Sequence, residues 1–557
     1  MIKLSGFGAS KGIAIGILHF YRNETQTVMR RRIEDVQLEL ARMDAARTAA
    51  ARELAELYEI ALEQVGEQGA LLFEIHQMML EDEDYCESIK SIITNQGINA
   101  EYAVALTGDN FSKMFAEMDD AYMQARASDV KDISERLIKI LSGKDTSVQH
   151  FDEPVILAAE DLAPSETVQL DKDKILAFVT VEGSNNSHTA ILARTMGIPA
   201  VIKLGKELSE ELEGKLVGVD GFTGELVVDP DSETLQKLQT RHEENVRKKR
   251  LLEQLKGMPA ETGYGQRVLT YANIGSIADL GAVLLNDAEG IGLFRTEFLY
   301  LESDHYPTES EQFNVYRKVV ERMSGKRVIF RTLDIGADKQ AAYFELPAEE
   351  NPAMGLRAIR ICLTREQIFK EQLRALLHAS NYGKLAIMFP MITSLWEIRE
   401  VKRILEDTKQ EMREAGLPFE EDIEFGVMIE TPAAAIVSNQ LAREVDFFSV
   451  GTNDLTQYLL AVDRQNQSLA RFHDAYHPAL LEMIRLASDN AHKHGKWIGI
   501  CGELAADLAM TETFLAFGID ELSVAPTSVL PLREKVRSLQ TDSRQDILRG
   551  HKAYLNE

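Results

Sequence analysis

The stretch RVIFRTLDIG, residues 327–336, joins a short apolar run to charged residues that follow it directly. Val, Ile and Phe in a run of this length are typical of a strand buried on both faces. Arg331 and Asp334 come where that strand would end. We therefore expect buried strands whose carboxyl ends carry polar chemistry.

Seven further runs of the same kind alternate with amphipathic helical patterns from about Arg267 onward. Eight strand–helix units of this total length predict a TIM (β/α)8 barrel. With the first run, they are VLTYANIG (268–275), GIGLFRTEF (290–298), RVIFRTLDIG (327–336), LAIMFPMI (385–392), IEFGVMIET (423–431), DFFSVGTNDL (446–455), WIGICGEL (497–504) and ELSVAP (521–526).

Polar residues follow five of these runs, and a TIM barrel gathers such residues at one mouth. Arginines and a lysine predict an anion clamp, because guanidinium forks match phosphate and carboxylate oxygens. Glu430 and Asp454 could hold Mg²⁺ together with a substrate phosphate. The strand-end residues are Arg295, Thr296, Glu297, Arg331, Asp334, Lys339, Glu430, Thr452, Asn453, Asp454, Arg464, Cys501 and Glu503.

Each of these residues also has a structural interpretation. An Arg after a strand can pair with a neighbouring helix. Glu430 can cap the helix that Pro432 would begin, and Cys501 can be an inert core residue. Charged or reactive groups at five separate strand ends favour the functional interpretation.

The first half of the chain changes character several times. Residues 1–20 look like strands, and 29–142 form a proline-free helical region with about twice as many acidic as basic residues. We expect one helix over 71–93 and another over 119–141. Strand patterns return from Pro154, and the polar helical stretch 229–257 predicts a bridge between domains. The predicted domains are 1–28 with 144–230 (α/β), 29–143 (helical insertion), 231–257 (linker helix) and 258–557 (barrel).

His188 lies between a Ser-Asn-Asn-Ser turn and a short apolar helix pattern that ends near Gly197. A helix N-terminus offers free N–H groups and a partial positive charge, which suit a phosphate. His188 is therefore a candidate nucleophile for phosphoryl transfer. The alternative is a surface or capping histidine.

The overall composition limits the classes of function. A net charge of -28 argues against a nucleic-acid binder and against docking on anionic lipid. It would suit a basic protein partner. Three widely separated cysteines predict neither a disulfide framework nor a metal site. No signal peptide or membrane span is recognisable, so we expect a cytoplasmic enzyme with no direct membrane insertion.

The combined pattern resembles the phosphoenolpyruvate-protein phosphotransferase family, Enzyme I of the bacterial phosphotransferase system. The resemblance covers essentially the whole chain in order. It is carried by EDLAPSET (160–167), SHTAILAR (187–194), GIGLFRTEFLY (290–300), FRTLDIGADK (330–339), NPAMGLRAIR (351–360), GVMIETPAA (426–434), SVGTNDLTQY (449–458) and GICGELA (499–505).

The resemblance implies a role for each matching residue. His188 would carry the phosphoryl group, supported by Thr167, and Cys501 would protonate the enolate. Glu430 and Asp454 would bind Mg²⁺. Phosphoenolpyruvate would be held by Arg295, Arg331, Arg464, Lys339, Arg357 and Asn453. The helical insertion would dock the phosphocarrier protein HPr, with His76, Met78, Met79, Tyr122, Met123 and Arg126 as candidates, and the barrel would form a homodimer.

One stretch departs from the family pattern. The family usually reads Gly-Gly-Arg-Thr-Ser-His, whereas residues 183–188 here read Gly-Ser-Asn-Asn-Ser-His. The missing Arg removes a positive charge beside His188. This affects the expected efficiency of transfer and the choice of HPr more than the reaction itself.

Three other functions compete with this interpretation. Pyruvate phosphate dikinase or phosphoenolpyruvate synthase would need an additional ATP-binding domain, for which the chain has no room and no P-loop. A non-catalytic regulator would not need Glu430, Asp454 and Cys501 together. A Mg²⁺-dependent barrel lyase leaves residues 1–230 unexplained.

Overall fold

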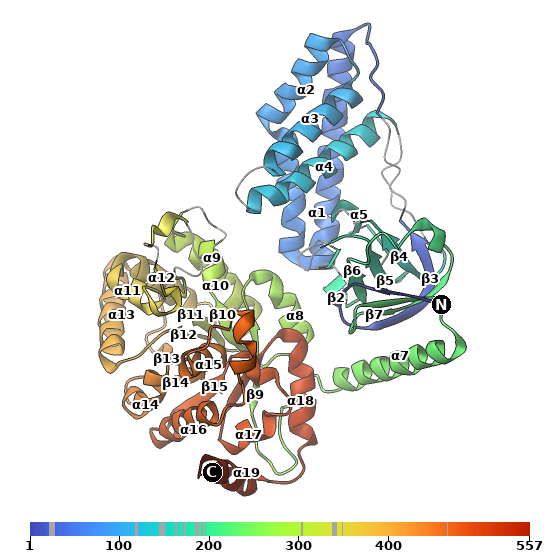
Figure 1. Cartoon of the computed structure of the whole chain (residues 1–557). Helices are drawn as coiled ribbons and strands as arrows, with labels where there is room; N and C mark the ends of the chain where they lie inside the picture. The colour runs from blue at the N-terminus through green and yellow to red at the C-terminus, as the bar shows by residue number, and fades with distance from the viewer. Residues whose placement is uncertain are drawn as a thin grey trace. The chain divides into compact units, whose positions relative to one another are not determined.

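A computed structural model describes the chain except residues 22–27, 117–120, 144–150, 161, 163, 168, 172–173, 184–188, 191–192, 195–196, 302, 304, 337–341, 348, 465 and 557. The chain divides into two compact units, Met1–Lys249 and Arg250–Glu557 (Figure 1).

The second unit is built on a closed barrel of eight parallel strands, as the eight apolar runs predict. The strands follow one another around the barrel in chain order, and β16 pairs with β9 to close it. They are β9 (Leu269–Ile274), β10 (Ile291–Arg295), β11 (Val328–Arg331), β12 (Leu385–Phe389), β13 (Glu424–Ile429), β14 (Phe447–Val450), β15 (Trp497–Ile500) and β16 (Glu521–Val524).

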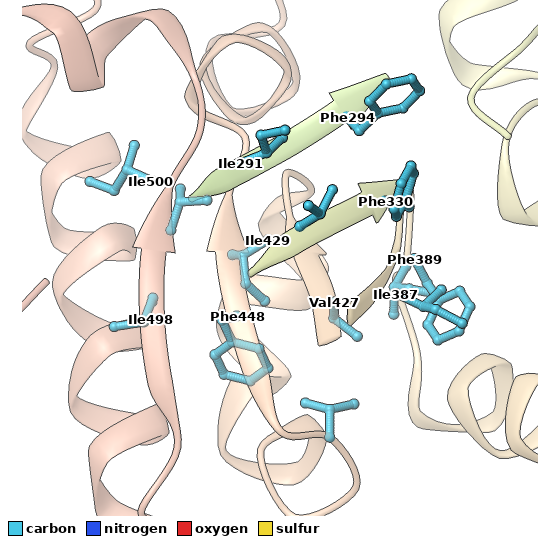
Figure 2. Packing of buried hydrophobic residues seen from close by; sticks show 14 of the residues in the cluster. Ile291, Phe294, Phe330, Ile387, Phe389, Val427, Ile429, Phe448, Ile498 and Ile500 are labelled. Carbon is cyan, nitrogen blue, oxygen red and sulfur yellow. The ribbon is translucent and has the colours of Figure 1, made fainter. Parts of the chain in front are cut away.

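The main core of this unit lies between the strands and the helices around them. Figure 2 shows strand residues of this layer, among them Ile291, Phe330 and Ile498, which are fully buried. Each such side chain contributes about 1.5–3 kcal/mol by leaving water. The helices are α8 (Leu280–Leu285), α9 (Glu297–Leu301), α10 (Glu309–Arg322), α11 (Ile359–Thr364), α12 (Glu366–Ser380), α13 (Leu395–Ala415), α14 (Pro432–Leu441), α15 (Thr452–Leu460), α16 (Pro478–Lys493), α17 (Thr511–Ala516), α18 (Val529–Ser538) and α19 (Arg544–Asn556).

The first unit contains a mixed eight-stranded sheet in the order β1-β8-β7-β3-β4-β5-β6-β2. The N-terminal strands belong to it, because β3 pairs with β7 on one side and with β4 on the other. The strands are β1 (Ile2–Ser5), β2 (Phe7–Ser10), β3 (Ile13–Phe20), β4 (Val155–Ala159), β5 (Ile175–Thr180), β6 (Ala200–Ile202), β7 (Leu216–Asp220) and β8 (Glu225–Val228), with the short helix α5 (Pro164–Thr167).

A helical bundle is inserted between β3 and β4. It consists of α1 (Val36–Glu81), α2 (Glu83–Gln96), α3 (Ala100–Ala116) and α4 (Ala121–Leu141) around their own apolar core. The prediction of one helix over 71–93 is wrong, because Asp82 ends α1 and caps α2 by accepting from the Tyr85 N–H at 2.9 Å. An Asp side chain competes for backbone N–H groups and so favours such a break.

The charged helix α7 (Ser232–Glu253) follows the sheet. Its surface is mostly polar, and among its described residues Leu238 is the buried one. Leu238 packs against Ile13 and Val227 of the sheet. Among the described helices, none combines the length and apolar character that a membrane span needs. The predicted fold class, an α/β domain with a helical insertion, a linker helix and a TIM barrel, is confirmed.

Candidate active site

Arg331 is the last residue of β11 and lies almost completely buried at the carboxyl end of the barrel. Its Nη2 is 2.5 Å from Glu297 Oε1, and its Nη1 is 2.9 Å from Asp334 Oδ2. Burial by itself would lower the pKa of Arg331, but Asp334 and Glu297 outweigh it and raise the pKa. The guanidinium is therefore a permanent, oriented cation.

Arg357 shares the carboxylate of Asp334 with Arg331. Arg357 Nη2 lies 3.1 Å from Asp334 Oδ1, and its Nη1 lies 3.4 Å from the Tyr458 hydroxyl. The next residue, Ala358, has a φ of 50°, a backbone conformation that L-residues rarely adopt. A strained turn therefore directs Arg357 toward the site.

Glu430 follows β13 directly and is fully buried. Its Oε1 accepts a hydrogen bond of 2.5 Å from the Met391 N–H. Burial and the nearby charges of Asp454 and Asp334 raise the pKa of Glu430 to about 8. The buried Glu430 and the partly buried Asp454 repel each other, and together they form a donor set that a hard cation would neutralise.

Asp454 lies in the first turn of α15, directly after β14. Its Oδ1 is 4.0 Å from Arg464 Nη2. The described residues contain no cluster of three or more His, Cys, Asp or Glu, so a cation held by Glu430 and Asp454 would take its other ligands from water and substrate.

Cys501 follows β15 and is buried beside these groups. Burial raises its pKa to about 12, although the charge of Arg331 acts in the opposite direction. The main chain of Cys501 is fixed by its N–H to Val450 O at 3.1 Å and by Asn273 Nδ2 to its carbonyl at 2.9 Å. The side chain is therefore a protonated thiol at neutral pH.

The loops after β14 and β15 are packed tightly together. Asn453 Oδ1 accepts a hydrogen bond of 3.1 Å from the Glu503 N–H. A Cβ at Gly502 would lie 2.0 Å from Thr452 Oγ1, so this position has no room for a side chain. These contacts fix the positions of Asn453, Asp454 and Cys501 relative to one another.

The structure brings four of the predicted barrel residues into one electrostatic cluster, namely Arg331, Glu430, Asp454 and Cys501. Arg357 joins them through Asp334. Arg295 ends β10 with an exposed side chain, and Arg464 is partly exposed. Lys339 lies outside the described residues.

In the first unit, Thr167 ends α5 and is buried. His188 and the Ser184-Asn185-Asn186 stretch lie outside the described residues. The helix pattern predicted after His188 is therefore only partly described.

The bundle residues differ sharply in exposure. Met78 is 67% exposed, whereas His76 is fully buried between Asp129 and Asp132, with ring nitrogens 3.5 and 3.7 Å from their carboxylates. His76 therefore does not lie on the exposed face where we expected it, because two acidic residues of α4 hold it inside. Met79 is partly buried against the bundle core. The side chains of Tyr122, Met123 and Arg126 lie outside the described residues.

Three family models of phosphoenolpyruvate-utilising enzymes match the chain in order. The N-terminal model matches residues 5–126, the mobile-domain model 151–224 and the phosphoenolpyruvate-binding domain model 249–541. The phosphoenolpyruvate-protein phosphotransferase of Bacillus subtilis is 42% identical over 97% of this chain and 95% of its own length. The chain belongs to this family.

Phosphoenolpyruvate-protein phosphotransferases from other bacteria show the same relation. Those of Geobacillus stearothermophilus and Haemophilus influenzae are each 43% identical over 96% of this chain, covering 93% and 94% of their own lengths. The resemblance inferred from the motifs is confirmed, and so is the prediction that the protein is an enzyme.

The sequence predicts no role for several residues that build this candidate site. Glu297 and Asp334 are recognisable as strand-end residues, but only the fold shows that they flank Arg331. Tyr458 of α15 contacts Arg357, and Met391, in the loop after β12, contacts Glu430. No local sequence signal distinguishes them, because each contact joins segments far apart in the chain.

Proposed function

We propose that the protein transfers the phosphoryl group of phosphoenolpyruvate to its own His188 and then to a histidine of HPr, releasing pyruvate. The observation that carries the proposal is the buried set of Arg331, Glu430 and Cys501 at one end of the barrel, in a member of this family. This set offers an oriented cation, a carboxylate for a metal and a protonated acid.

Phosphoenolpyruvate carries a phosphate and a carboxylate, and the site has groups for both. Arg331 and Arg357 are positioned before substrate arrives, since Asp334 holds both guanidiniums. Arg295 and Arg464 add exposed positive charge at the rim. Positioning of this kind, rather than covalent assistance, dominates phosphoryl transfer.

Mg²⁺ fits the donor set of Glu430 and Asp454. When bound, it would supply positive charge to the phosphoryl oxygens and to the leaving enolate. The raised pKa of Glu430 without a cation supports this assignment, because a dication would remove the repulsion that raises it.

Cys501 is suited to protonate the methylene carbon of the enolate. A thiol with a pKa of about 12 keeps its proton until a strong base such as an enolate is formed beside it. Ketonisation to pyruvate then makes the overall step downhill, which allows a reactive phosphohistidine to form.

The histidine-bearing domain must move between the barrel and HPr. The contacts of α7 and of the residues after it limit the hinge to a short segment. Upstream, His242 Nδ1 lies 2.6 Å from the Ile13 carbonyl oxygen of the sheet. Downstream, Arg533 donates to Leu255 O at 3.0 Å, and Gly257 N donates to Asp287 Oδ2 at 2.7 Å. Lys249 Nζ also lies 3.5 Å from the Gly197 carbonyl oxygen of the first unit. We therefore place the hinge in residues 250–254, before the attachments to the barrel unit.

The bundle would receive HPr, and its acidity would suit a basic rim on that partner. Met78, exposed on α1, is the apolar candidate at the contact. We also propose a cytoplasmic location and a homodimer through the barrel; light scattering on the purified protein tests the dimer.

The deciding experiment uses phosphoenolpyruvate with a labelled phosphate, Mg²⁺ and no carrier, followed by HPr. We expect acid-labile label on the wild type, none on His188→Ala, and transfer of the label to HPr. Label that stays on the enzyme would assign a different acceptor and would direct attention to Ser184-Asn185-Asn186. No label on the wild type would favour the alternative of a non-catalytic regulator.

A further inference from the structure

Asn273 lies near the end of β9, and its side-chain amide spans two neighbouring strands of the barrel wall. Its Nδ2 donates to the Cys501 carbonyl oxygen at 2.9 Å, just beyond β15, and to the Ser523 carbonyl oxygen of β16 at 3.0 Å. Its Oδ1 accepts a hydrogen bond of 2.5 Å from the Ser523 hydroxyl. One side chain thus joins three adjacent segments of the wall by three hydrogen bonds.

The neighbours of this amide determine which way it faces. Carbonyl oxygens accept hydrogen bonds and cannot donate them, so the amide nitrogen must lie toward the carbonyl groups of Cys501 and Ser523. Both N–H groups are then used inside the barrel wall. Asn273 therefore has no donor left for a substrate and acts on the reaction through the residues that it holds.

The amide replaces backbone pairing at the point where two strands separate. The ladder between β15 and β16 stops at Ile500, which pairs with Leu522. Cys501 is the next residue, and among the described residues no backbone N–H donates to its carbonyl oxygen. Without Asn273 this oxygen would be an acceptor without a partner in a buried residue, which is costly.

The hydrogen bond from Asn273 also limits rotation of the peptide group after Cys501. On one side of Cys501, its N–H donates to Val450 O at 3.1 Å. On the other side the chain continues into Gly502, where the lack of a side chain makes rotation of the peptide easy. Asn273 fixes this second peptide group, so rotation about the Cα–Cβ bond is the main freedom left to the thiol.

The thiol itself faces an apolar layer inside the barrel. Cys501 packs with Leu293 and Met428 in one buried cluster, and Leu293 lies opposite Asn273 in the register of β9 and β10. Apolar neighbours do not direct a thiol, and its contact with Val450 O, at 3.7 Å, is long. The direction of the thiol therefore depends on the main chain that carries it.

We propose that Asn273 is a positioning residue for the protonation step, because it fixes the main chain from which the Cys501 thiol reaches the enolate. The proposal rests on the proposed function, in which the S–H bond of Cys501 breaks and a C–H bond forms at the methylene carbon. A thiol held in one direction delivers its proton to one face of the planar enolate. A misplacement of about 1 Å can slow such a step about a hundredfold.

The test determines the face of the enolate at which the proton arrives. Phosphoenolpyruvate with tritium in one defined methylene position is converted in D₂O with Mg²⁺ and HPr, after the thiol has exchanged its hydrogen for deuterium. The methyl group of the product then carries hydrogen, deuterium and tritium, and its handedness reports the face of protonation. Enzymatic reduction of pyruvate to lactate as it forms prevents a second exchange.

The wild type should give one handedness. Asn273→Leu keeps the shape of the side chain and removes all three hydrogen bonds, so its product should approach equal amounts of both forms. Its kcat should fall about tenfold or more, while KM for phosphoenolpyruvate stays within about twofold, because Arg331 and Glu430 keep their own contacts. Asn490→Leu is the matched control, since Asn490 is a half-buried residue of α16 that donates to Ser438 Oγ of α14 at 2.8 Å. It should keep the wild-type handedness.

A role in packing alone predicts a different order of variants. Leu fills the volume of Asn whereas Ala leaves a cavity, so packing makes Asn273→Ala the worse change. Loss of positioning makes Asn273→Leu at least as severe, because in Asn273→Ala water can enter the space and donate to the two carbonyl groups. Thermal unfolding shows whether each variant has folded, and loss of handedness in Asn273→Ala carries the test if Asn273→Leu does not fold.

The outcomes separate this proposal from the proposed function. Wild-type handedness in the folded Asn273 variants, or its loss in Asn490→Leu, overturns the positioning role while the proposed function stands. Equal amounts of both forms from the wild type overturn the assignment of Cys501 as the acid. Absence of labelled His188 in the wild type overturns the proposed function, and the positioning role with it.

Discussion

Asp334 holds two buried guanidiniums at once, and replacing it tests how the substrate site is held in place. Its Oδ2 is 2.9 Å from Arg331 and its Oδ1 is 3.1 Å from Arg357, and all three residues are almost completely buried. The change Asp334→Asn keeps the shape of the side chain and removes its charge. It leaves the two cations with Glu297 as the remaining carboxylate in direct contact with Arg331.

Removing one partner of a buried ion pair costs about 3–5 kcal/mol, because the remaining charge has lost its compensation. In a unit of this size, each kcal/mol lowers the unfolding midpoint by about 2–3 °C, so the barrel transition should fall by about 6–15 °C. An anionic ligand supplies the missing charge. Phosphoenolpyruvate should therefore raise the midpoint of Asp334→Asn more than that of the wild type.

Differential scanning calorimetry measures this, with and without phosphoenolpyruvate and Mg²⁺. Asp407→Asn is the matched control, because Asp407 pairs with Arg403 at 2.6 Å on the surface, where both side chains are nearly half exposed. The control midpoint should stay unchanged. If the unfolding midpoint of Asp334→Asn equals that of Asp407→Asn, the reasoning that Asp334 compensates the charge of the buried arginines is refuted.

Three further predictions concern the thiol, the packed loops and the bundle. The Cys501 thiol has a pKa of about 12 in the folded protein, whereas in the unfolded chain it ionises near 9.0. Between pH 9 and 12 the free energy of unfolding of the wild type should therefore fall, relative to that of Cys501→Ala, by about 1.4 kcal/mol per pH unit. Below pH 9 the contribution of the buried thiol to stability is fully present, and urea unfolding at pH 8 and pH 10 measures its loss. If the difference in free energy of unfolding between the wild type and Cys501→Ala is the same at both pH values, the burial of Cys501 is contradicted. Gly502→Ala should destabilise the barrel by about 1–3 kcal/mol and reduce phosphorylation, since the new methyl group would lie 2.0 Å from Thr452 Oγ1. Gly281→Ala on helix α8 is the control, because no atom lies within 4 Å of the added methyl group. It should be neutral or stabilising by up to about 1 kcal/mol. Equal effects of the two substitutions would contradict the tight packing at Gly502. Met78→Asp should slow transfer to HPr about tenfold or more and leave the rate of His188 phosphorylation by phosphoenolpyruvate unchanged; a slower first step would place Met78 in the folding of the bundle instead.

The barrel could be predicted because each strand carries its own signal. A run such as VIF before Arg331 is apolar over its whole length, and eight such runs allow few folds. The prediction for the helical region was wrong at one point. The sequence pattern of Leu71–Ile93 indicates one continuous helix, but Asp82 divides this stretch into α1 and α2. The helical periodicity continues across this break, and only the geometry of the cap separates α1 from α2.

The candidate site was predictable in part for the same reason. Arg331, Glu430 and Cys501 each follow an apolar run, so their position at a strand end is visible in the sequence. His76 was misplaced on the exposed face of the bundle. Its burial depends on Asp129 and Asp132, which come from a helix more than fifty residues later in the chain.

The sequence by itself determined which segments are strands and helices, the family, and the residue types available for chemistry. These are local properties, set by side-chain size, hydrophobic period and motif. The tertiary structure alone decided that Asp334 joins Arg331 to Arg357, that Met391 holds Glu430, and that the Glu503 N–H donates to Asn453. Such contacts depend on strand register and barrel closure, and therefore on the free energy of the whole fold rather than on any one segment.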